Sequence, residues 1–332
     1  MKVDIFTHIL PKKYIAALEK KAPPGFYMAE AIGGISTLTD LDVRFRIIDK
    51  YDDMMQVLTL GAPAVEQICG PEDAAELAKV GNDEMAELLV KYPDKFAAAV
   101  ASLPMNNMDA ALKEADRAIN DLKFKGVQIY TPINGKPIDH LDFWPLYEKM
   151  AEYNLPIWIH PERDRAIPDY PTEQRSKYTI AALFGWPYET TAAMTRLIFS
   201  GVYRTYPNIK FITHHAGGMV PFFEQRIEEF YNIAEMRLNS RFMRSVTEPP
   251  LTSFRRFYND TAIYGSTPAL MCAYAFFGAE HLLFGTDFPY DAHLGDRHIR
   301  ETIRSIQEMD IPEAEKKMIF EGNARKLARL AI

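Results

Sequence analysis

The sequence has very few cysteines and no long hydrophobic run. Cys69 and Cys272 are the only cysteines among 332 residues. Their wide separation gives neither a disulfide framework nor a metal-type cysteine spacing, so we interpret both as small packed side chains. No window holds about 18 uncharged apolar residues, so we predict no membrane-spanning helix. The apolar run in MKVDIFTHILPKK is too short for a secretory signal, and we therefore expect a cytoplasmic protein.

The sequence also lacks an excess of positive charge. Its 38 basic and 45 acidic residues give a formal net charge of −7. Nucleic-acid binding requires a basic surface, so this balance argues against such a partner. The hydrophobic share of 48% and the charged share of 25% are ordinary for a globular protein. A chain of this length fits one α/β-barrel domain, residues 1–332.

Short apolar runs alternate with longer helical patterns. We predict strands at Val3–Phe6, Gln56–Leu60, Phe96–Ser102, Gly126–Tyr130, Pro156–His160, Ile209–Thr213, Phe257–Thr261 and His281–Gly285. The predicted helices are Glu72–Lys91, Asp109–Leu122, Leu141–Tyr153, Thr179–Thr205, Pro221–Arg237, Thr267–Phe277, Arg297–Met309 and Pro312–Leu330. Eight such units predict a parallel sheet closed into an α/β fold of the (β/α)8 (TIM) barrel type. Pro23–Leu41 interrupts the alternation, and we interpret it as an inserted loop after the first strand, a candidate lid.

Histidines and one aspartate gather where predicted strands end. His8, His160, the pair His214–His215 and Asp287 all occupy such positions. The carboxyl ends of barrel strands meet at one mouth, so these side chains are expected to converge there. His8, His160 and Asp287 would supply three ligands for a catalytic metal, and one histidine of the pair would transfer protons. Taken singly, each histidine could instead be a hydrogen-bonding loop residue, and Asp287 a helix cap or turn residue.

The four other histidines do not follow predicted strands in this way, and we interpret them as structural or surface residues: His140, His281, His293 and His298.

Longer motifs around these residues resemble a known family. VDIFTHILP, IWIHP, FGWPYETT, IFSGVYRTYPNIKFITHHAGGMVP and HLLFGTDFPY occur in this order. RFRIIDKYDDMMQVLTL resembles a further early motif. Together they resemble the amidohydrolase superfamily, and within it the branch that includes aminocarboxymuconate-semialdehyde decarboxylase.

This resemblance implies a role for each matching residue. His8, His160 and Asp287 would bind a divalent metal, with zinc favoured over manganese. Spacing to the following glycines places His215 at the family's catalytic histidine, with Asp287 sharing the catalytic role. His214 would then be a neighbour that faces the other side, because successive residues of a strand alternate in direction.

Arg44 and Trp186 are candidate substrate contacts, and two further arginines lie close to His160 in the sequence. Arg44 matches a family arginine that grips a carboxylate, a task suited to a planar guanidinium. Its alternative is a surface position on a helix. Trp186 either lines the pocket or packs in the core. Arg163 and Arg165 lie beside Glu162 and Asp164, and we expect surface ion pairs there rather than substrate contacts.

Phe6 departs from the family pattern. The family has its first histidine of H-x-H here, and phenylalanine cannot coordinate a metal. Residues two apart in a strand share a face, so Phe6 is expected to join His8 at the barrel mouth as an aromatic wall for the substrate. The remaining ligands could retain the metal, hold it only weakly or with substrate, or have lost it.

The resemblance implies non-oxidative decarboxylation of an unsaturated or aromatic carboxylic acid, hence a small anionic substrate. The alternatives are hydrolysis of a lactone, amide or enol ester at the same site, hydration of a double bond, and a non-catalytic binding protein. Relatives are often dimers, so a homodimer is expected. Arg237, Arg241 and Arg244 either reach across its interface or form a solvated basic face.

Overall fold

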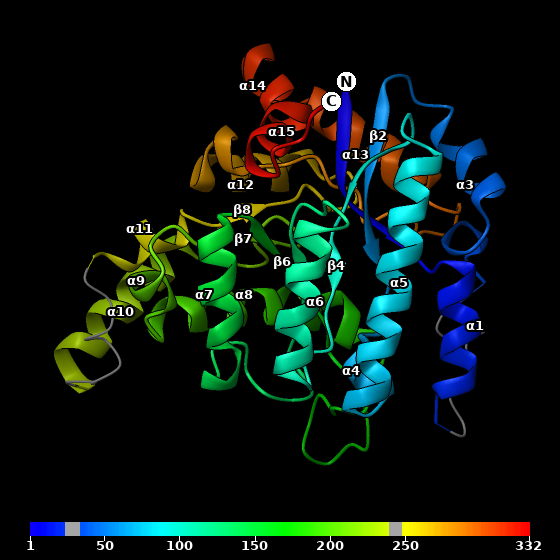
Figure 1. Cartoon of the computed structure of the whole chain (residues 1–332). Coiled ribbons are helices and arrows are strands. Elements are labelled where there is room, and N and C mark those ends of the chain that lie inside the picture. Colours follow the sequence, from blue (N-terminus) through cyan, green and yellow to red (C-terminus); the bar gives the residue numbers. More distant parts are fainter. Residues whose placement is uncertain (24–33, 239–247) are drawn as a thin grey trace.

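The structure, a computed structural model, describes residues 1–23, 34–238 and 248–332. It confirms the predicted parallel α/β barrel, in which helices surround the strands (Figure 1). Each strand pairs in parallel with the next, and β3 runs into β4 through the single residue Val100. The strands are β1 (Lys2–Ile9), β2 (Met54–Leu60), β3 (Phe96–Ala99), β4 (Ala101–Ser102), β5 (Val127–Thr131), β6 (Pro156–Pro161), β7 (Lys210–Thr213) and β8 (Tyr258–Asn259).

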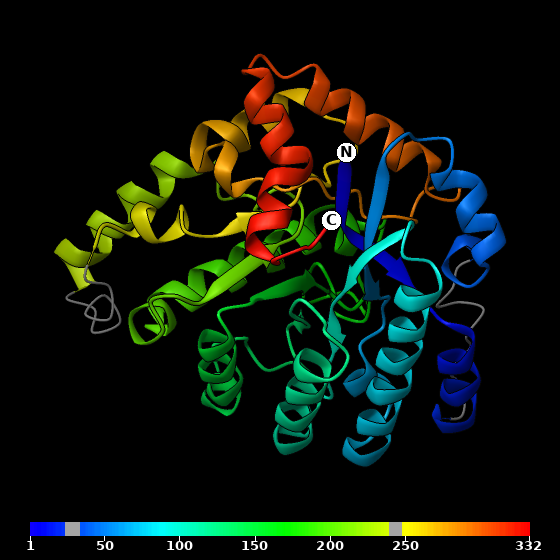
Figure 2. The same ribbon diagram turned by 45° about the horizontal axis from the view of Figure 1, so that its top comes forward.

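The helices form the outer layer, seen from a second direction in Figure 2. α5 begins where Pro71 fixes the first helical φ, with acidic residues in its first turn and Lys91 in its last. The helices are α1 (Lys12–Lys21), α3 (Leu41–Ile48), α4 (Val65–Ile68), α5 (Pro71–Lys91), α6 (Met108–Asn120), α7 (Trp144–Tyr153), α8 (Trp186–Phe199), α9 (Val202–Thr205), α10 (Glu224–Leu238), α11 (Pro250–Phe254), α12 (Thr267–Phe277), α13 (Asp296–Gln307), α14 (Glu313–Lys317) and α15 (Asn323–Leu327).

Two predicted helices are divided in the structure. The expected helix over 179–205 consists of a π-helical turn (Ala181–Gly185), α8 and α9, and Gly201 with φ 90° separates the last two. The expected helix over 312–330 is likewise interrupted by a π-helical segment, Met318–Gly322, between α14 and α15. Most of the candidate lid lies outside the described residues, which resume at residue 34.

The predicted eighth strand is wrong as a regular strand, although its segment closes the barrel. Ile5 N–H donates to the Phe284 carbonyl (3.0 Å), and Leu283 N–H donates to the Asn259 carbonyl (2.8 Å). The Gly285 and Thr286 N–H groups instead donate to the side chains of Thr261 and Asp4. Because side chains take these hydrogen bonds, no continuous strand ladder forms over residues 282–288.

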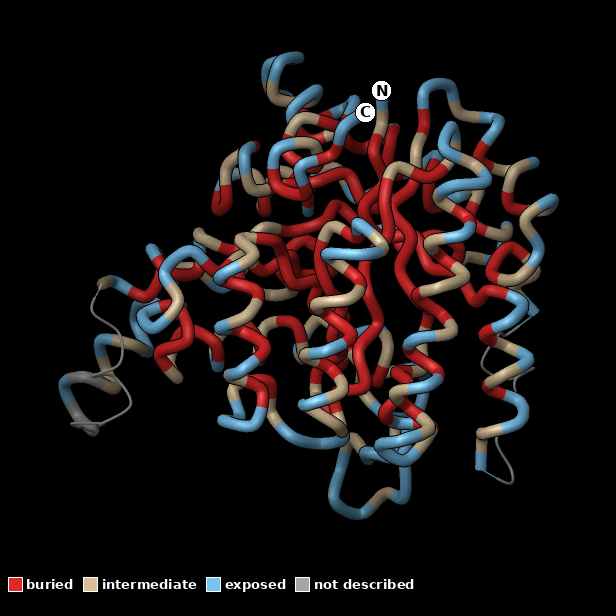
Figure 3. Tube along the Cα trace, in the orientation of Figure 1, coloured by how far each residue is buried: buried red, intermediate tan, exposed pale blue. Residues whose placement is uncertain are grey.

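Buried residues fill both the barrel and the layer between strands and helices (Figure 3). One apolar cluster gathers Val3, Val57, Trp158 and Ile212 from strands around the sheet, so it lies inside the barrel. Leu327 near the C-terminus joins this cluster. The two termini lie side by side, and the N-terminal amine is 3.7 Å from a Glu321 carboxylate oxygen. Among the described residues, no helix is both long and apolar enough to cross a bilayer.

Candidate metal centre

Three histidines and one aspartate meet at the carboxyl end of the strands. His8 lies in β1, His160 in β6, His214 directly after β7 and Asp287 in the closing segment. One ligand atom from each lies within 4.8 Å of the other three, and all four residues are buried. The structure therefore brings together the three predicted ligands, His8, His160 and Asp287, and adds His214.

Hydrogen bonds at Nδ1 orient the three imidazoles in the same way. His8 Nδ1 is 3.0 Å from Thr59 Oγ1, a hydroxyl that itself donates to the Thr7 carbonyl. His160 Nδ1 is 2.8 Å from the Pro161 carbonyl oxygen, and His214 Nδ1 contacts the Asp260 carboxylate. Each partner accepts a proton from Nδ1. Each Nε2 lone pair is then free for a cation, the usual arrangement in metal-binding histidines.

The centre of the cluster is short of hydrogen-bond donors and rich in acceptors. Asp287 Oδ1 lies 3.3 Å from His8 Nε2 and 3.2 Å from His214 Nε2. His8 Nε2 is buried without a well-directed hydrogen bond among the described residues. A divalent cation would satisfy all of these atoms at once, so this donor set fits a metal.

The protonation states also suit a cation. Burial lowers the pKa of His8, and it lowers that of His160 far below its ordinary value. Burial alone would raise the pKa of Asp287, but His214 and His8 hold it well below its usual range. Burial likewise opposes a charged His214, yet Asp260 and Asp287 raise its pKa to about 10. Two carboxylates thus favour positive charge here, which a metal ion would supply in place of a proton.

The prediction that His214 faces away from the site is wrong. Strand alternation ends at Thr213, the last residue of β7. His215 and Ala216 have φ angles of 58° and 52°, so the chain turns sharply through left-handed conformations. Both imidazoles consequently point to the same side and stack, with ring centroids 4.2 Å apart and 19° between their planes.

His215 lies beside the four-residue cluster and outside it. Its Nε2 is 3.3 Å from the Tyr264 hydroxyl, while its Nδ1 is buried without a partner among the described residues. Burial and the neighbouring His214 lower the pKa of His215 to about 4, so its imidazole is neutral near pH 7. A neutral histidine next to the cluster is free to exchange protons with a bound molecule.

Phe6 and Trp186 both lie at the cluster. The Phe6 ring is fully buried and stacks on His214 at 4.1 Å, with 9° between the planes. The half-buried Trp186 ring is 6.1 Å from that of His160 and 6.3 Å from that of His215. Phe6 therefore supports a histidine from behind, and Trp186 forms part of the wall.

Arg44 lies behind the site rather than on the surface. Its guanidinium is fully buried, donates to Gln56 Oε1 (2.8 Å) and the His8 carbonyl (2.8 Å), and lies 4.7 Å from the Phe288 ring centre. These bonds hold the backbone that carries His8. Its predicted contact with a substrate carboxylate stays a prediction.

Among the described residues, neither Arg163 nor Arg165 forms a hydrogen bond or ion pair with the cluster. Arg163 pairs with Glu189 at 3.2 Å, so the expected partners Glu162 and Asp164 were wrong for this residue. Arg165 is exposed. Arg237 is in α10, and Arg241 and Arg244 lie outside the described residues.

Sequence reasoning missed three residues around the cluster. Asp260 is fully buried and binds His214 Nδ1 as well as the N–H groups of Ala216 and Ala262. Its position at the end of a predicted strand was the signal that could have identified it. Tyr264 follows four residues later, and Tyr290 packs its ring 5.2 Å from that of His8. No strand end marks either tyrosine.

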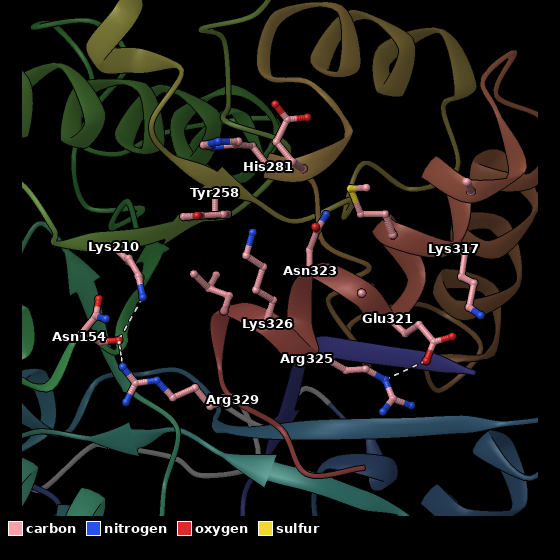
Figure 4. Close-up of a pocket in the computed structure, with 15 residues that line it drawn as sticks. Asn154, Lys210, Tyr258, His281, Lys317, Glu321, Asn323, Arg325, Lys326 and Arg329 are labelled. Atoms are coloured by element: carbon pink, nitrogen blue, oxygen red, sulfur yellow. Dashed lines mark hydrogen bonds and ion pairs between the residues drawn. The ribbon is translucent and has the colours of Figure 1, made fainter.

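A separate hollow of about 1050 Å³ opens at the opposite end of the barrel (Figure 4). Lys210 and Tyr258, the first residues of β7 and β8, line it together with residues of the C-terminal helices. Barrel enzymes place their chemistry at the carboxyl ends of the strands. The hollow is therefore distinct from the histidine cluster.

Comparisons with known proteins identify the family of the chain. The sequence model of the family described as Amidohydrolase matches residues 39–330. A 2-amino-3-carboxymuconate-6-semialdehyde decarboxylase of Dictyostelium discoideum is 29% identical over 98% of this chain and 90% of its own. A solved 2,6-dihydroxybenzoate decarboxylase, complexed with 2,6-dihydroxybenzoate, is 27% identical, with a TM-score of 0.78 over 99% of this chain and 98% of its own.

A third relative was solved with a metal. It is a dihydroxybenzoic acid decarboxylase from Polaromonas sp. JS666 with bound manganese and the inhibitor 2-nitroresorcinol. It is 25% identical, with a TM-score of 0.81 over 99% of this chain and 96% of its own. The chain belongs to the amidohydrolase family. Its similarity to these decarboxylases confirms the predicted class, a carbon–carbon lyase of the non-oxidative type.

Proposed function

We propose that this chain, acting as one domain over residues 1–332, removes CO₂ from an aromatic carboxylic acid that carries a hydroxyl beside the carboxylate. The observation that carries the proposal is the buried cluster of His8, His160, His214 and Asp287. The names of the relatives support the substrate class, since two of them act on or bind dihydroxybenzoate. An unsaturated, non-aromatic carboxylate of muconate type, as named for the Dictyostelium relative, is the alternative substrate.

The four clustered residues would hold the metal. His214 would take the place of the ligand that Phe6 cannot supply, which favours retained binding over a weakened or lost site. Three imidazoles and one carboxylate are a donor set typical of Zn²⁺. We therefore propose zinc, with manganese, present in the Polaromonas relative, as the alternative metal.

When bound, the metal would polarise the hydroxyl oxygen of the substrate, which helps to delocalise negative charge. As the carbon–carboxylate bond breaks, its electron pair stays on the ring carbon, and that carbon must gain a proton. We assign delivery of this proton to His215, which lies outside the ligand set and stacks on His214 at 4.2 Å. A bound carboxylate adds negative charge beside His215, so it raises the low pKa of this imidazole and favours uptake of a proton as the substrate enters.

The decisive experiment measures CO₂ release and metal content together. Zinc-loaded protein is assayed with 2,6-dihydroxybenzoate, salicylate and a muconate-type acid. His215→Gln is expected to lower kcat by about 100-fold or more, the usual share of a general acid. Asp287→Asn is expected to lose metal and activity together. His281→Gln is the matched control, because His281 stacks on Tyr258 at the other end of the barrel.

Two outcomes would contradict the proposal. One is metal content below about 0.2 equivalents after reconstitution with either zinc or manganese, a level too low for a resident ligand set. The other is hydrolysis of a lactone or ester by the same site without CO₂ release from any acid in the panel.

We also propose a cytoplasmic homodimer. Exposed aromatic side chains occur on two adjacent segments, at Phe184 and Tyr188 around the start of α8 and at Phe222 before α10. The Met219 N–H donates to Thr191 Oγ1 and joins these segments. Exposed apolar side chains in neighbouring segments are typical of an interface. Light scattering of Phe222→Asp should report a monomer if a second copy covers this surface.

A further inference from the structure

The Tyr264 hydroxyl lies between the two groups that would perform the chemistry. It is 3.3 Å from His215 Nε2 and 3.3 Å from Asp287 Oδ2. Tyr264 has a φ of 56°, a left-handed conformation that is costly for a side chain of this size. Its ring packs on His298, with 4.8 Å between centroids. The fold therefore holds this hydroxyl in place against a local backbone cost.

The partners fix the direction of both hydrogen bonds. Asp287 is a carboxylate, which can only accept, so the Tyr264 O–H donates to Oδ2. The hydroxyl proton is then committed, and the phenol oxygen can only accept from His215. The donor in that bond is an N–H at Nε2 of His215.

The other ring nitrogen of His215 does not distinguish the tautomers. Nδ1 is buried and has no hydrogen-bond partner among the described residues, so it is unsatisfied whether or not it carries a proton. The contact with Tyr264 distinguishes them, because a bare Nε2 would face a phenol oxygen whose proton is already donated to Asp287. The geometry therefore selects the neutral tautomer with its proton on Nε2.

We propose that Tyr264 is a positioning residue that accepts the Nε2–H of His215, holds this imidazole in its Nε2–H tautomer and so fixes the orientation of the ring beside the metal cluster. With a metal in place of its second proton, His214 would have the opposite tautomer, because Asp260 accepts its Nδ1 proton. Two adjacent, stacked histidines are thus held in different forms: His214 presents a lone pair to the metal position, and His215 donates its N–H to the Tyr264 oxygen. The meaning of this N–H for catalysis rests on the proposed decarboxylase function, whereas the tautomer itself does not.

The test reads the tautomer directly. Zinc-loaded, ¹⁵N-labelled protein is examined by long-range ¹H–¹⁵N correlation of its histidine rings, and the His215 signals are identified by their loss in His215→Gln. Wild type is expected to show a protonated Nε2 and a bare Nδ1. Tyr264→Phe is expected to lose this single pattern. Tyr203→Phe is the control, since it removes a different tyrosine hydroxyl, one that is buried and has no hydrogen-bond partner among the described residues.

A protonated Nδ1 in wild type would overturn the proposal, as would an unchanged Nε2–H pattern in a folded Tyr264→Phe. The wild-type measurement decides the matter even if that variant does not fold. In turnover, Tyr264→Phe should lower kcat roughly tenfold, the worth of one hydrogen bond, with KM changed less than twofold. If no acid is decarboxylated but the tautomer pattern holds, the proposed function fails and the role of Tyr264 stands.

Discussion

The substitution Asp260→Asn tests whether Asp260 orients His214 as a metal ligand. Asp260 Oδ1 accepts from the N–H groups of Ala216 and Ala262, each at 3.0 Å, and Oδ2 faces His214 Nδ1. An asparagine keeps an oxygen for the two backbone groups. It places an NH₂ donor against His214, however, so that Nδ1 must accept and the imidazole proton moves to Nε2. His214 then presents a proton where the metal would bind.

The expected loss follows from this reversal. Removing the outer partner of a metal-bound histidine usually weakens metal binding by about 10–100-fold. That range corresponds to about 1.4–2.7 kcal/mol. We expect a loss of affinity near 100-fold, because Asp260 is fully buried and a water molecule has no access to His214 Nδ1 from that side. The substitution also removes one of the two negative charges that raise the pKa of His214.

Zinc affinity would be measured by competition with a chromophoric chelator, alongside circular dichroism to verify the fold. Glu66→Gln is the control, since Glu66 is a buried carboxylate in α4 and contacts none of the site histidines in any hydrogen bond of the described residues. A zinc affinity of Asp260→Asn within threefold of wild type would refute the proposed role of His214 as a ligand.

Three further changes have defined outcomes. Phe6→His adds an imidazole on the face shared with His8 and should slow zinc transfer to a chelator; unchanged release would show that residue 6 cannot reach the metal. Burial raises the pKa of Glu66 from 4.5 to about 8, so the folded state binds the extra proton and stability should fall as pH rises through this window, by at most about 1.4 kcal/mol per pH unit. Glu66→Gln should abolish that slope in urea titrations at pH 5 and pH 8, and a wild-type slope that persists in the variant would contradict the assignment. Gly217→Ala should destabilise the fold by about 1–3 kcal/mol, because φ is 77° and an added Cβ would lie 2.7 Å from the Phe277 ring; an unchanged Tm would show that this turn relaxes freely.

The barrel and most of its site could be predicted because strand ends have a common geometric meaning. His8, His160 and Asp287 were found from their positions after apolar runs, and the closed sheet brings them together. His214 could not be placed correctly, since the alternation rule holds only within a strand and β7 ends one residue earlier. The left-handed turn at His215 depends on tertiary contacts that no periodicity records.

Features that depend on contacts between residues distant in sequence were harder to predict. The closing segment satisfies its backbone through Asp4 and Thr261, so its hydrogen bonds depend on side chains distant in sequence. Tyr264 reaches the site from beyond β8, at a distance from the strand end that the barrel pattern does not fix. Arg44 was recognised as important, but the direction of its guanidinium depends on Gln56 and the His8 carbonyl.

The barrel has a seam, where β1 meets residues 282–288, and the cluster lies across it. His8 belongs to one side of the seam and Asp287 to the other. Backbone bonds from Ile5 and His8 and the contact of Thr286 with Asp4 join the two sides. A cation held between His8 and Asp287 would link the two sides of this seam and so connect β1 to the closing segment, residues 282–288. Metal occupancy would then control how often β1 and residues 282–288 separate locally. Loss of the ion would first increase hydrogen exchange of the backbone amides along this seam, before it caused global unfolding.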